Sequence, residues 1–204
     1  FLAYALVDRL EYKKINYTLS FLGSGLLVSA AAWQYEGKVL AFALLLIALI
    51  GSSLGYLLKR EELRVWSLAI LFAAIFKSLF EPYGSADKVF LFNAKFGLMF
   101  ANCAVLLFVG WMYSLFEAGE FEKGVEKVLQ IIAAAVLWFA VSWDITVGFA
   151  PYGNAQNFMA FWWVIYPVAL AWIGFAGKRR GLMQLSVLLV CASLIKVLIL
   201  PYAS

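Results

Sequence analysis

The chain has 204 residues, of which 65% are hydrophobic and 14% are charged, and its formal net charge is +4. Soluble domains contain about 45–50% apolar and about 25% charged residues, so this composition excludes an ordinary soluble domain. The sequence contains no histidine, the commonest general base and metal ligand. We therefore expect a protein that is not an enzyme, with no catalytic residues, no metal site and no cofactor.

Apolar segments of roughly 16–22 residues follow one another along the chain, and each is long enough to cross a hydrocarbon core of about 30 Å as an α-helix. In chain order they are residues 17–34, 39–58, 65–80, 96–115, 125–143, 158–176 and 182–200. Short connections join them, so neighbouring helices should run antiparallel. The sequence predicts an all-α fold, a polytopic bundle of about seven transmembrane helices in the lipid bilayer.

Basic residues are concentrated in alternate connections. The N-terminal stretch and the second, fourth and sixth connections carry three, three, two and three Lys or Arg residues, eleven of the sixteen in the chain. By the positive-inside rule this side is cytoplasmic, which places the N-terminus inside and Ser204 outside the inner membrane. The net charge is thus a signal of topology, and nucleic acid is not an expected partner.

Two parts of the sequence match each other without gaps. Residues 55–85 align with residues 174–204, 119 positions later. The identical pairs include Gly55 and Gly174, Lys59-Arg60 and Lys178-Arg179, Ser67 and Ser186, Lys77 and Lys196, and Pro82-Tyr83 and Pro201-Tyr202. Several of these residues are polar, Gly or Pro, so shared hydrophobicity does not explain the match.

The alignment predicts a parallel internal repeat of three helices. Upstream the offset is 110, which pairs Trp33 with Trp143, and an insertion of nine residues near 145–153 accounts for the difference. Residues 1–95 then form the first repeat, residues 96–120 a connecting transmembrane helix, and residues 121–204 the second repeat. Because the period is four spans, equivalent helices run in the same direction, unlike the inverted repeats of many transporters.

Lys77 and Lys196 are the first candidates for a functional role. Each lies late in an apolar helix, where an ionisable group is costly and marks a candidate site, although a lysine near the interface can also extend its ammonium to the headgroups. Glu36 and Asp144 lie on the same side, close behind equivalent tryptophans. We predict that Lys77 approaches Glu36 and that Lys196 approaches Asp144. Such pairs would bind a solute group or fix the helix register.

Three further polar residues lie within the predicted spans, namely Asn102, Ser67 and Ser186. An intramembrane asparagine normally forms a hydrogen bond to a neighbouring helix, so we expect Asn102 to join helices. The two serines are paired by the repeat and mark equivalent positions.

One pattern resembles a family of uncharacterised bacterial multi-pass membrane proteins, and it is carried by Arg64, Ser67, Lys77, Phe90, Asn93 and Phe96. In those proteins a helix with an Arg, an apolar run and a Lys recurs along a chain of many helices. The resemblance covers residues 55–204, and the second copy departs from it with Met183 in the position of Arg64. It implies an architecture and no particular activity.

The chain begins with a short apolar stub, residues 1–6, followed at once by Asp8 and Arg9. This form is typical of the tail of a preceding helix and lacks the features of a signal peptide. We interpret the chain as a piece of a longer polytopic protein. Its expected partners, besides lipid, are other helices of that longer chain or further copies in a homo-oligomer.

A second pattern, Trp163-Val-Ile-Tyr166-Pro167, looks like the Trp-x-x-Tyr-Pro motif of microbial rhodopsins. The resemblance implies a retinal-binding photoreceptor with Lys196 as the Schiff-base lysine. The sequence departs from that family at Ala192, where an Asp is usual, and it has no counterion motif in the third helix. A protonated Schiff base needs such an anion to hold its proton.

We expect a non-enzymatic membrane protein, either a transport-related bundle or a cell-envelope scaffold. A water-accessible cleft that reaches Lys77 or Lys196 would favour transport, because polar groups at membrane depth mark solute pathways. A dry, continuous interface would favour scaffolding. The retinal-binding photoreceptor is the alternative.

Overall fold

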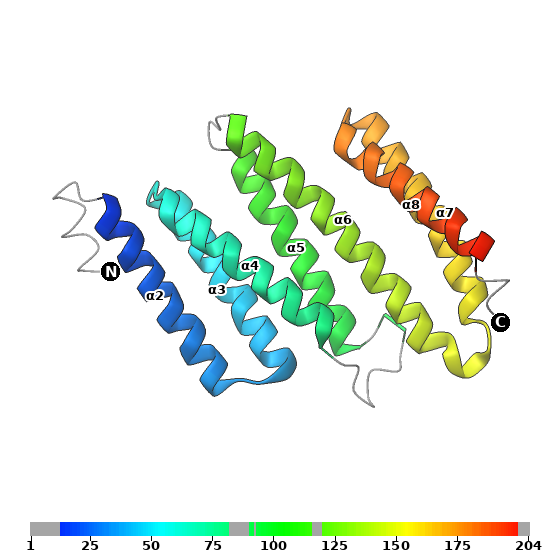
Figure 1. Ribbon diagram of the computed structural model, residues 1–204, viewed down its shortest axis with the longest axis horizontal. Coiled ribbons are helices and arrows are strands. Elements are labelled where there is room, and N and C mark those ends of the chain that lie inside the picture. Colours follow the sequence, from blue (N-terminus) through cyan, green and yellow to red (C-terminus); the bar gives the residue numbers. More distant parts are fainter. Residues whose placement is uncertain (1–12, 82–89, 92, 116–119, 200–204) are drawn as a thin grey trace. The chain divides into compact units, whose positions relative to one another are not determined.

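The computed structural model describes residues 13–81, 90–91, 93–115 and 120–199 (Figure 1). Within these residues all regular secondary structure is helical, which confirms the all-α part of the predicted fold class. The elements are α2 (Lys13–Gln34), α3 (Gly37–Leu57), α4 (Glu61–Phe80), α5 (Ala94–Leu115), α6 (Glu120–Phe149), the 3₁₀ helix η1 (Ala150–Tyr152), α7 (Ala155–Ala176) and α8 (Arg180–Ile199).

Five helical segments among the described residues are long and apolar enough to cross a membrane, namely 37–57, 61–80, 94–115, 124–152 and 155–176. α2 is not among them, since serine, glycine and terminal polar residues dilute its apolar side chains. In α8 the segment Arg180–Ile195 is a shorter apolar helix. Five described helices are therefore consistent with a multi-pass protein, and membrane insertion and seven spans remain predictions.

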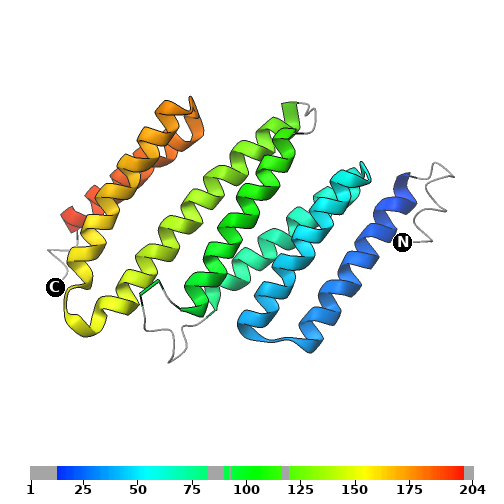
Figure 2. The ribbon, with the colours of Figure 1, turned by 180° about the vertical axis from the view of Figure 1, so that it is seen from behind.

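The residue contacts divide the chain into two compact units, residues 1–82 and 83–204. In the first unit, α3 packs along α4, and α2 packs against both (Figure 1). In the second unit, α5 packs along α6, and α7 packs along α8 and α6, as Figure 2 shows from behind. The helix predicted to connect the two repeats, α5, thus packs with the second unit.

Small residues allow α3 and α4 to approach closely. A Cβ atom added to Gly51 would lie 3.1 Å from Ser67 Cβ, and Ser52 Oγ donates a hydrogen bond to Ser67 Oγ at 2.8 Å. Ser67 Oγ in turn donates to the Arg64 carbonyl oxygen at 2.8 Å. Close backbone approach through small residues is a common way of packing transmembrane helices. Ser67 therefore joins the two helices.

Aromatic side chains of α7 connect it to α6. Trp163 Nε1 donates to Ser142 Oγ at 3.1 Å, and the Tyr166 hydroxyl donates to the Ala134 carbonyl oxygen at 2.6 Å. The rings of Trp138 and Trp163 lie 4.8 Å apart, within the range of favourable aromatic pairs. The residues that resemble a rhodopsin motif thus hold α7 against α6.

Pro167 lies inside α7 and interrupts the backbone hydrogen bonds of the helix. Proline has no backbone N–H, so the carbonyl of Trp163, four residues earlier, loses its helical donor. Ser193 of α8 replaces that donor, with its Oγ 3.1 Å from the Trp163 carbonyl oxygen and 2.7 Å from that of Leu189. The single hydroxyl proton of Ser193 is shared between these two carbonyls, so the serine partly satisfies the one that the proline leaves exposed.

α6 continues beyond its predicted end at residue 143. The helix reaches Phe149, and η1 follows, ending at Gly153 with φ +71°. Asp144, which the sequence placed in a connection, is 1% exposed and lies within the helix. Residues 145–153, interpreted as an insertion in a loop, therefore form the end of α6 and η1.

Candidate functional site

The turn between α2 and α3 forms one wall of an open pocket in the first unit. Glu36 is extended, with φ −125°, and Gly37 has φ +57°, a conformation that glycine adopts at little cost. A Cβ atom added to Gly37 would lie 2.9 Å from Glu81 Oε1. The backbone angle therefore favours glycine at this position, and a larger side chain would also have to displace the Glu81 carboxylate.

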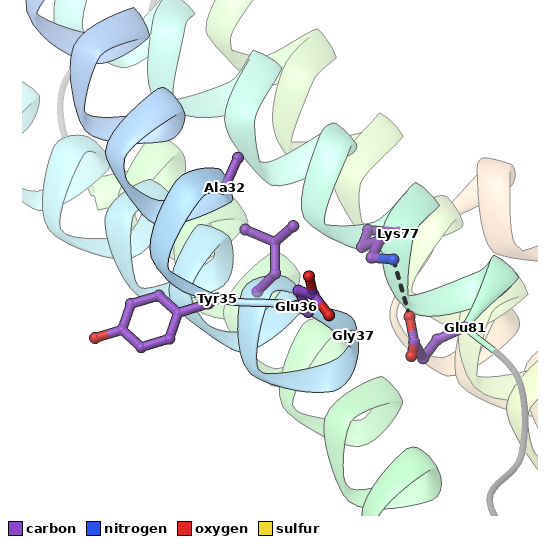
Figure 3. Close-up of a pocket in the computed structure, with 7 residues that line it drawn as sticks. Ala32, Tyr35, Glu36, Gly37, Lys77 and Glu81 are labelled. Atoms are coloured by element: carbon purple, nitrogen blue, oxygen red, sulfur yellow. Dashed lines mark ion pairs between the residues drawn. The ribbon is translucent and has the colours of Figure 1, made fainter.

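Lys77, in the last turn of α4, forms an ion pair with Glu81 (Figure 3). The Lys77 Nζ atom lies 3.0 Å from Glu81 Oε2, and the two side chains are 40% and 12% exposed. A cation in the last turn also interacts favourably with the partial negative charge at the helix C-terminus. The ammonium group is thus held at the pocket while a large part of the side chain stays accessible.

The pocket has a volume of about 640 Å³, and it is lined by Ala32, Tyr35, Glu36, Gly37, Leu40, Lys77 and Glu81. The structure brings the predicted pair, Lys77 and Glu36, to the same pocket. The ion pair that it shows is with Glu81, which sequence reasoning missed although an i, i+4 spacing favours such a pair. A direct contact between Lys77 and Glu36 stays a prediction.

An ammonium group and two carboxylates can hold a small group that carries both charges. Charge-assisted hydrogen bonds of this type are about twice as strong as neutral ones. Figure 3 shows the Tyr35 ring directed away from Lys77 and Glu81. Among the described residues, no group of three or more Cys, Asp or Glu side chains could hold a metal ion.

In the second unit, Asp144 is the centre of a separate polar cluster. Its Oδ2 accepts a hydrogen bond from the Leu91 backbone N–H at 2.6 Å, and its Oδ1 accepts one from Asn93 Nδ2. Asn93 Oδ1 accepts from the Phe96 N–H at 2.7 Å and so caps the start of α5. Asp144 therefore fixes the chain segment that leads into α5.

The same segment is pressed closely against α6. Leu91 has φ +62°, an uncommon conformation for a side chain of this size. A Cβ atom added to Gly148 would lie 3.1 Å from Phe90 Cβ, so glycine makes room for the segment. The strain at Leu91 is held in place by the Asp144 hydrogen bond and by this contact.

Lys95 belongs to this cluster and was not predicted as a site residue. It is 3% exposed, and its Nζ atom lies 5.5 Å from the centroid of the Trp143 ring. A cation over an indole face is attracted by the ring quadrupole. The sequence predicts a span that begins at residue 96, which left Lys95 outside it, whereas α5 begins at Ala94 and includes Lys95. The Lys196 side chain, predicted to approach Asp144, lies outside the described residues.

The remaining predicted polar residues lie inside helix packing. Asn102 is fully buried, and its Nδ2 donates to the Leu98 carbonyl oxygen at 2.9 Å, one turn earlier in α5. Ser186 is buried in α8 and donates to the Met183 carbonyl oxygen at 2.7 Å. An interhelical hydrogen bond from Asn102 stays a prediction.

The turns that follow α3 and α7 have the same local geometry. Lys59 and Lys178 have φ +53° and +52°. The next N–H in each turn, from Arg60 and Arg179, donates to the carbonyl oxygen five residues earlier, at 2.8 Å and 2.7 Å. This pattern is that of a Schellman motif with a lysine in the left-handed position.

Glycines equivalent under the 119-residue offset allow both turns to close. A Cβ atom added to Gly55 would lie 2.9 Å from the Arg64 backbone nitrogen, and one added to Gly174 would lie 3.0 Å from that of Met183. The Arg-to-Met difference between the copies therefore leaves the backbone contact unchanged.

Comparison with protein-family models, curated proteins and solved structures gives no match for this chain. The resemblances to the bacterial membrane family and to rhodopsins therefore stay predictions. For the rhodopsin resemblance, an absorption spectrum of the purified protein with retinal is the direct test.

Proposed function

We propose that this chain is a non-enzymatic, multi-pass protein of the inner membrane that binds a small charged solute group as part of transport. The observation that carries the proposal is the open pocket shared by the Lys77 ammonium and the carboxylates of Glu36 and Glu81. A polar, accessible pocket at the end of apolar helices is the arrangement expected where a solute enters or leaves a membrane bundle.

Exposed apolar side chains along the helices support insertion into a membrane. Leu57, Phe76 and Phe80 in the first unit and Trp172 and Phe175 in the second are 65–76% exposed. Large apolar side chains exposed along several helices are costly in water and are expected where lipid covers the surface. Hydrocarbon around the helices would remove these side chains from water.

The native Cys191 provides a test of membrane insertion. It is exposed on α8 within an apolar stretch, whereas Cys103 is buried. Maleimides react with the thiolate, which does not form in hydrocarbon, so a polar maleimide should label Cys191 in SDS and leave it unlabelled in intact membranes. An Asn154→Cys variant, placed in the exposed α6–α7 connection, is the control that should react in both. Equal labelling of Cys191 and this control in membranes would contradict insertion.

The two matching turns support the proposed parallel repeat. Their hydrogen bonds, left-handed lysines and close glycine contacts occur at positions 119 residues apart. A helix-ending motif with lysine instead of glycine in the left-handed position is unusual, so its occurrence twice at this spacing favours duplication. In the proposed architecture, residues 1–95 and 121–204 are the two copies.

The pocket chemistry favours a zwitterionic group. Lys77 would contact the negative part of such a group, and Glu36 its positive part, while Glu81 holds Lys77 in position. A solute with a single charge would satisfy one side of the pocket and leave the other without a partner. We therefore expect a preference for amino-acid-like solutes over simple cations or anions.

Thermal unfolding of the purified chain in nanodiscs, with and without added solute, tests this proposal. Zwitterionic amino acids should raise the Tm, and the increase should grow with their concentration. At ten times the Kd, binding should add about 1.4 kcal/mol to the free energy of unfolding. Tetramethylammonium and acetate should have smaller effects. Glu36→Gln should remove the stabilisation, and Glu61→Gln, at an exposed position of α4, should keep it. If no zwitterion stabilises the protein, the pocket is not a solute site.

Scaffolding in the cell envelope is the second candidate, and the Asp144 cluster favours it. Asp144 is 1% exposed, and the hydrogen bonds that it accepts from Leu91 and Asn93 position the start of α5. A bundle whose ionisable groups only fix its helices would be suited to a structural role. Absence of solute binding in the experiment above, with a stable fold, is the result expected for a scaffold.

A further inference from the structure

A second pocket lies where the α7–α8 turn meets α6. It has a volume of about 400 Å³, and its polar lining consists of Lys127 and Gln130 of α6 and of Lys178, Arg179 and Arg180 from the turn and the start of α8. All of these residues belong to the second unit. The pocket thus combines four cationic side chains from two parts of the chain.

The backbone explains why these cations converge. The turn ends α7 with Lys178 in the left-handed conformation, which reverses the chain and presents three basic residues in succession. At the next residue, a Cβ atom added to Gly181 would lie 2.7 Å from Ile131 Cδ1. The start of α8 therefore lies close to the Ile131 side chain of α6, and the basic turn lines the same pocket as Lys127.

The four cations of this pocket have few acidic neighbours among the side chains that the structure describes. None of the four forms an ion pair with another described residue. The neighbouring acid, Glu126, accepts a hydrogen bond from Gln130 Nε2 at 2.7 Å. The first turn of α8 also directs backbone N–H groups toward its own N-terminal end, which favours an anion there.

The equivalent turn between α3 and α4 shows that this charge is not needed for the fold. Both turns have the same hydrogen bonds, but Lys59 and Arg60 are followed by Glu61 and Glu62. In the second turn Arg180 and Gly181 occupy those two positions. The same turn geometry therefore occurs with acids that balance the cations and without them, so the turn itself does not require the excess positive charge. Membrane topology favours basic residues on this side, and the excess is also available to bind an anion.

We propose that the pocket formed by Lys127, Lys178, Arg179 and Arg180 binds a phosphate group. Guanidinium groups bind phosphate oxygens through two parallel hydrogen bonds, and ammonium groups add point charges. Basic pockets between helices on the cytoplasmic side of a membrane bind the headgroups of anionic lipids. The phosphate would come from such a headgroup or from a soluble phosphate compound.

Binding to the detergent-purified 204-residue chain tests the proposal with three probes: dioctanoyl phosphatidylglycerol, dioctanoyl phosphatidylcholine and inorganic pyrophosphate. The phosphatidylglycerol should bind more tightly than the zwitterionic phosphatidylcholine. Pyrophosphate binding as tight as that of phosphatidylglycerol would identify a soluble ligand, and its absence would identify a lipid headgroup. Either result supports a phosphate site. Failure of both anionic probes to bind would overturn it.

Variants distinguish binding in this pocket from a general attraction of anions to the positive charge of the protein. Each cation removed should weaken binding about fivefold, so Arg179→Gln with Arg180→Gln should lower the affinity about 30-fold. Arg60→Gln, at the equivalent position of the first turn, should change it less than twofold. Equal weakening by both would refute the proposal. If the double variant does not fold, the Arg179→Lys, Arg180→Lys variant should still bind the anionic probes with reduced affinity. Binding of these probes to the native protein should weaken as salt is added, and binding that does not change with salt would also refute the proposal.

Discussion

Replacing Asp144 by alanine should destabilise the second unit more than any exposed substitution. Asp144 is 1% exposed, and it accepts hydrogen bonds from the Leu91 N–H and from Asn93 Nδ2. Its removal leaves both partly buried donors without their carboxylate acceptor. The strained conformation of Leu91 then also loses the bond that holds it.

The two lost hydrogen bonds set the size of the effect. Bonds to charged groups contribute about 1.5–3 kcal/mol each, whereas hydrogen bonds between transmembrane helices average about 0.6 kcal/mol. The loss for two bonds therefore lies between about 1 and 6 kcal/mol. Because Asp144 is ionisable and nearly fully buried, we expect about 3 kcal/mol, near the middle of this range.

Equilibrium unfolding of the purified chain in mixed micelles, by titration with SDS, measures this loss. Glu61→Ala, which removes an exposed carboxylate, is the control and should change stability by less than about 0.5 kcal/mol. A double-mutant cycle with Asn93→Ala should give a coupling of about 1 kcal/mol, since the two side chains share one bond. An Asp144→Ala effect equal to that of the control would refute this account of the cluster.

Further substitutions test the helix packing by the same unfolding measurement. Ser193→Ala should lower the free energy of unfolding by about 1 kcal/mol. In a Pro167→Ala background the loss should be much smaller, because the new backbone N–H of residue 167 replaces the serine donor. Equal losses in the two backgrounds would contradict this explanation. Gly37→Ala should cost more than about 1 kcal/mol and weaken zwitterion binding, because its methyl group would meet a carboxylate; full retention of binding would argue against the pocket geometry. Gly55→Ala and Gly174→Ala should destabilise by similar amounts, about 1–3 kcal/mol, as expected for equivalent turns, and a large difference would weaken the repeat.

The helical fold followed from the length and spacing of the apolar segments, but helix ends did not. The sequence predicts a helix over 65–80, and α4 begins at Glu61, because acidic residues favour a helix N-terminus that an apolar pattern overlooks. At the other extreme, α6 continues past Asp144 to Phe149. A charged residue was interpreted as the end of a span, whereas tertiary hydrogen bonds allow it to lie inside the helix.

The candidate sites were predictable only in part. The sequence indicates that Lys77 and Glu36 lie near one end of the helices, and the structure places both at one pocket. The partner Glu81 could have been found from its i, i+4 spacing. The contact of Asp144 with the Leu91 N–H could not, since it depends on where a distant backbone segment passes.

The topology of the chain in its membrane is the most direct test of the central claim. In a cysteine-free background, Glu61→Cys places a single thiol at the exposed start of α4, and Asn154→Cys places one in the exposed α6–α7 connection. These two positions should lie on opposite sides of the membrane. In intact spheroplasts a membrane-impermeant maleimide should label the cysteine at 154 and leave the one at 61 unlabelled until the membrane is permeabilised. Labelling of both positions, or of position 61 alone, in intact spheroplasts would contradict the proposed orientation.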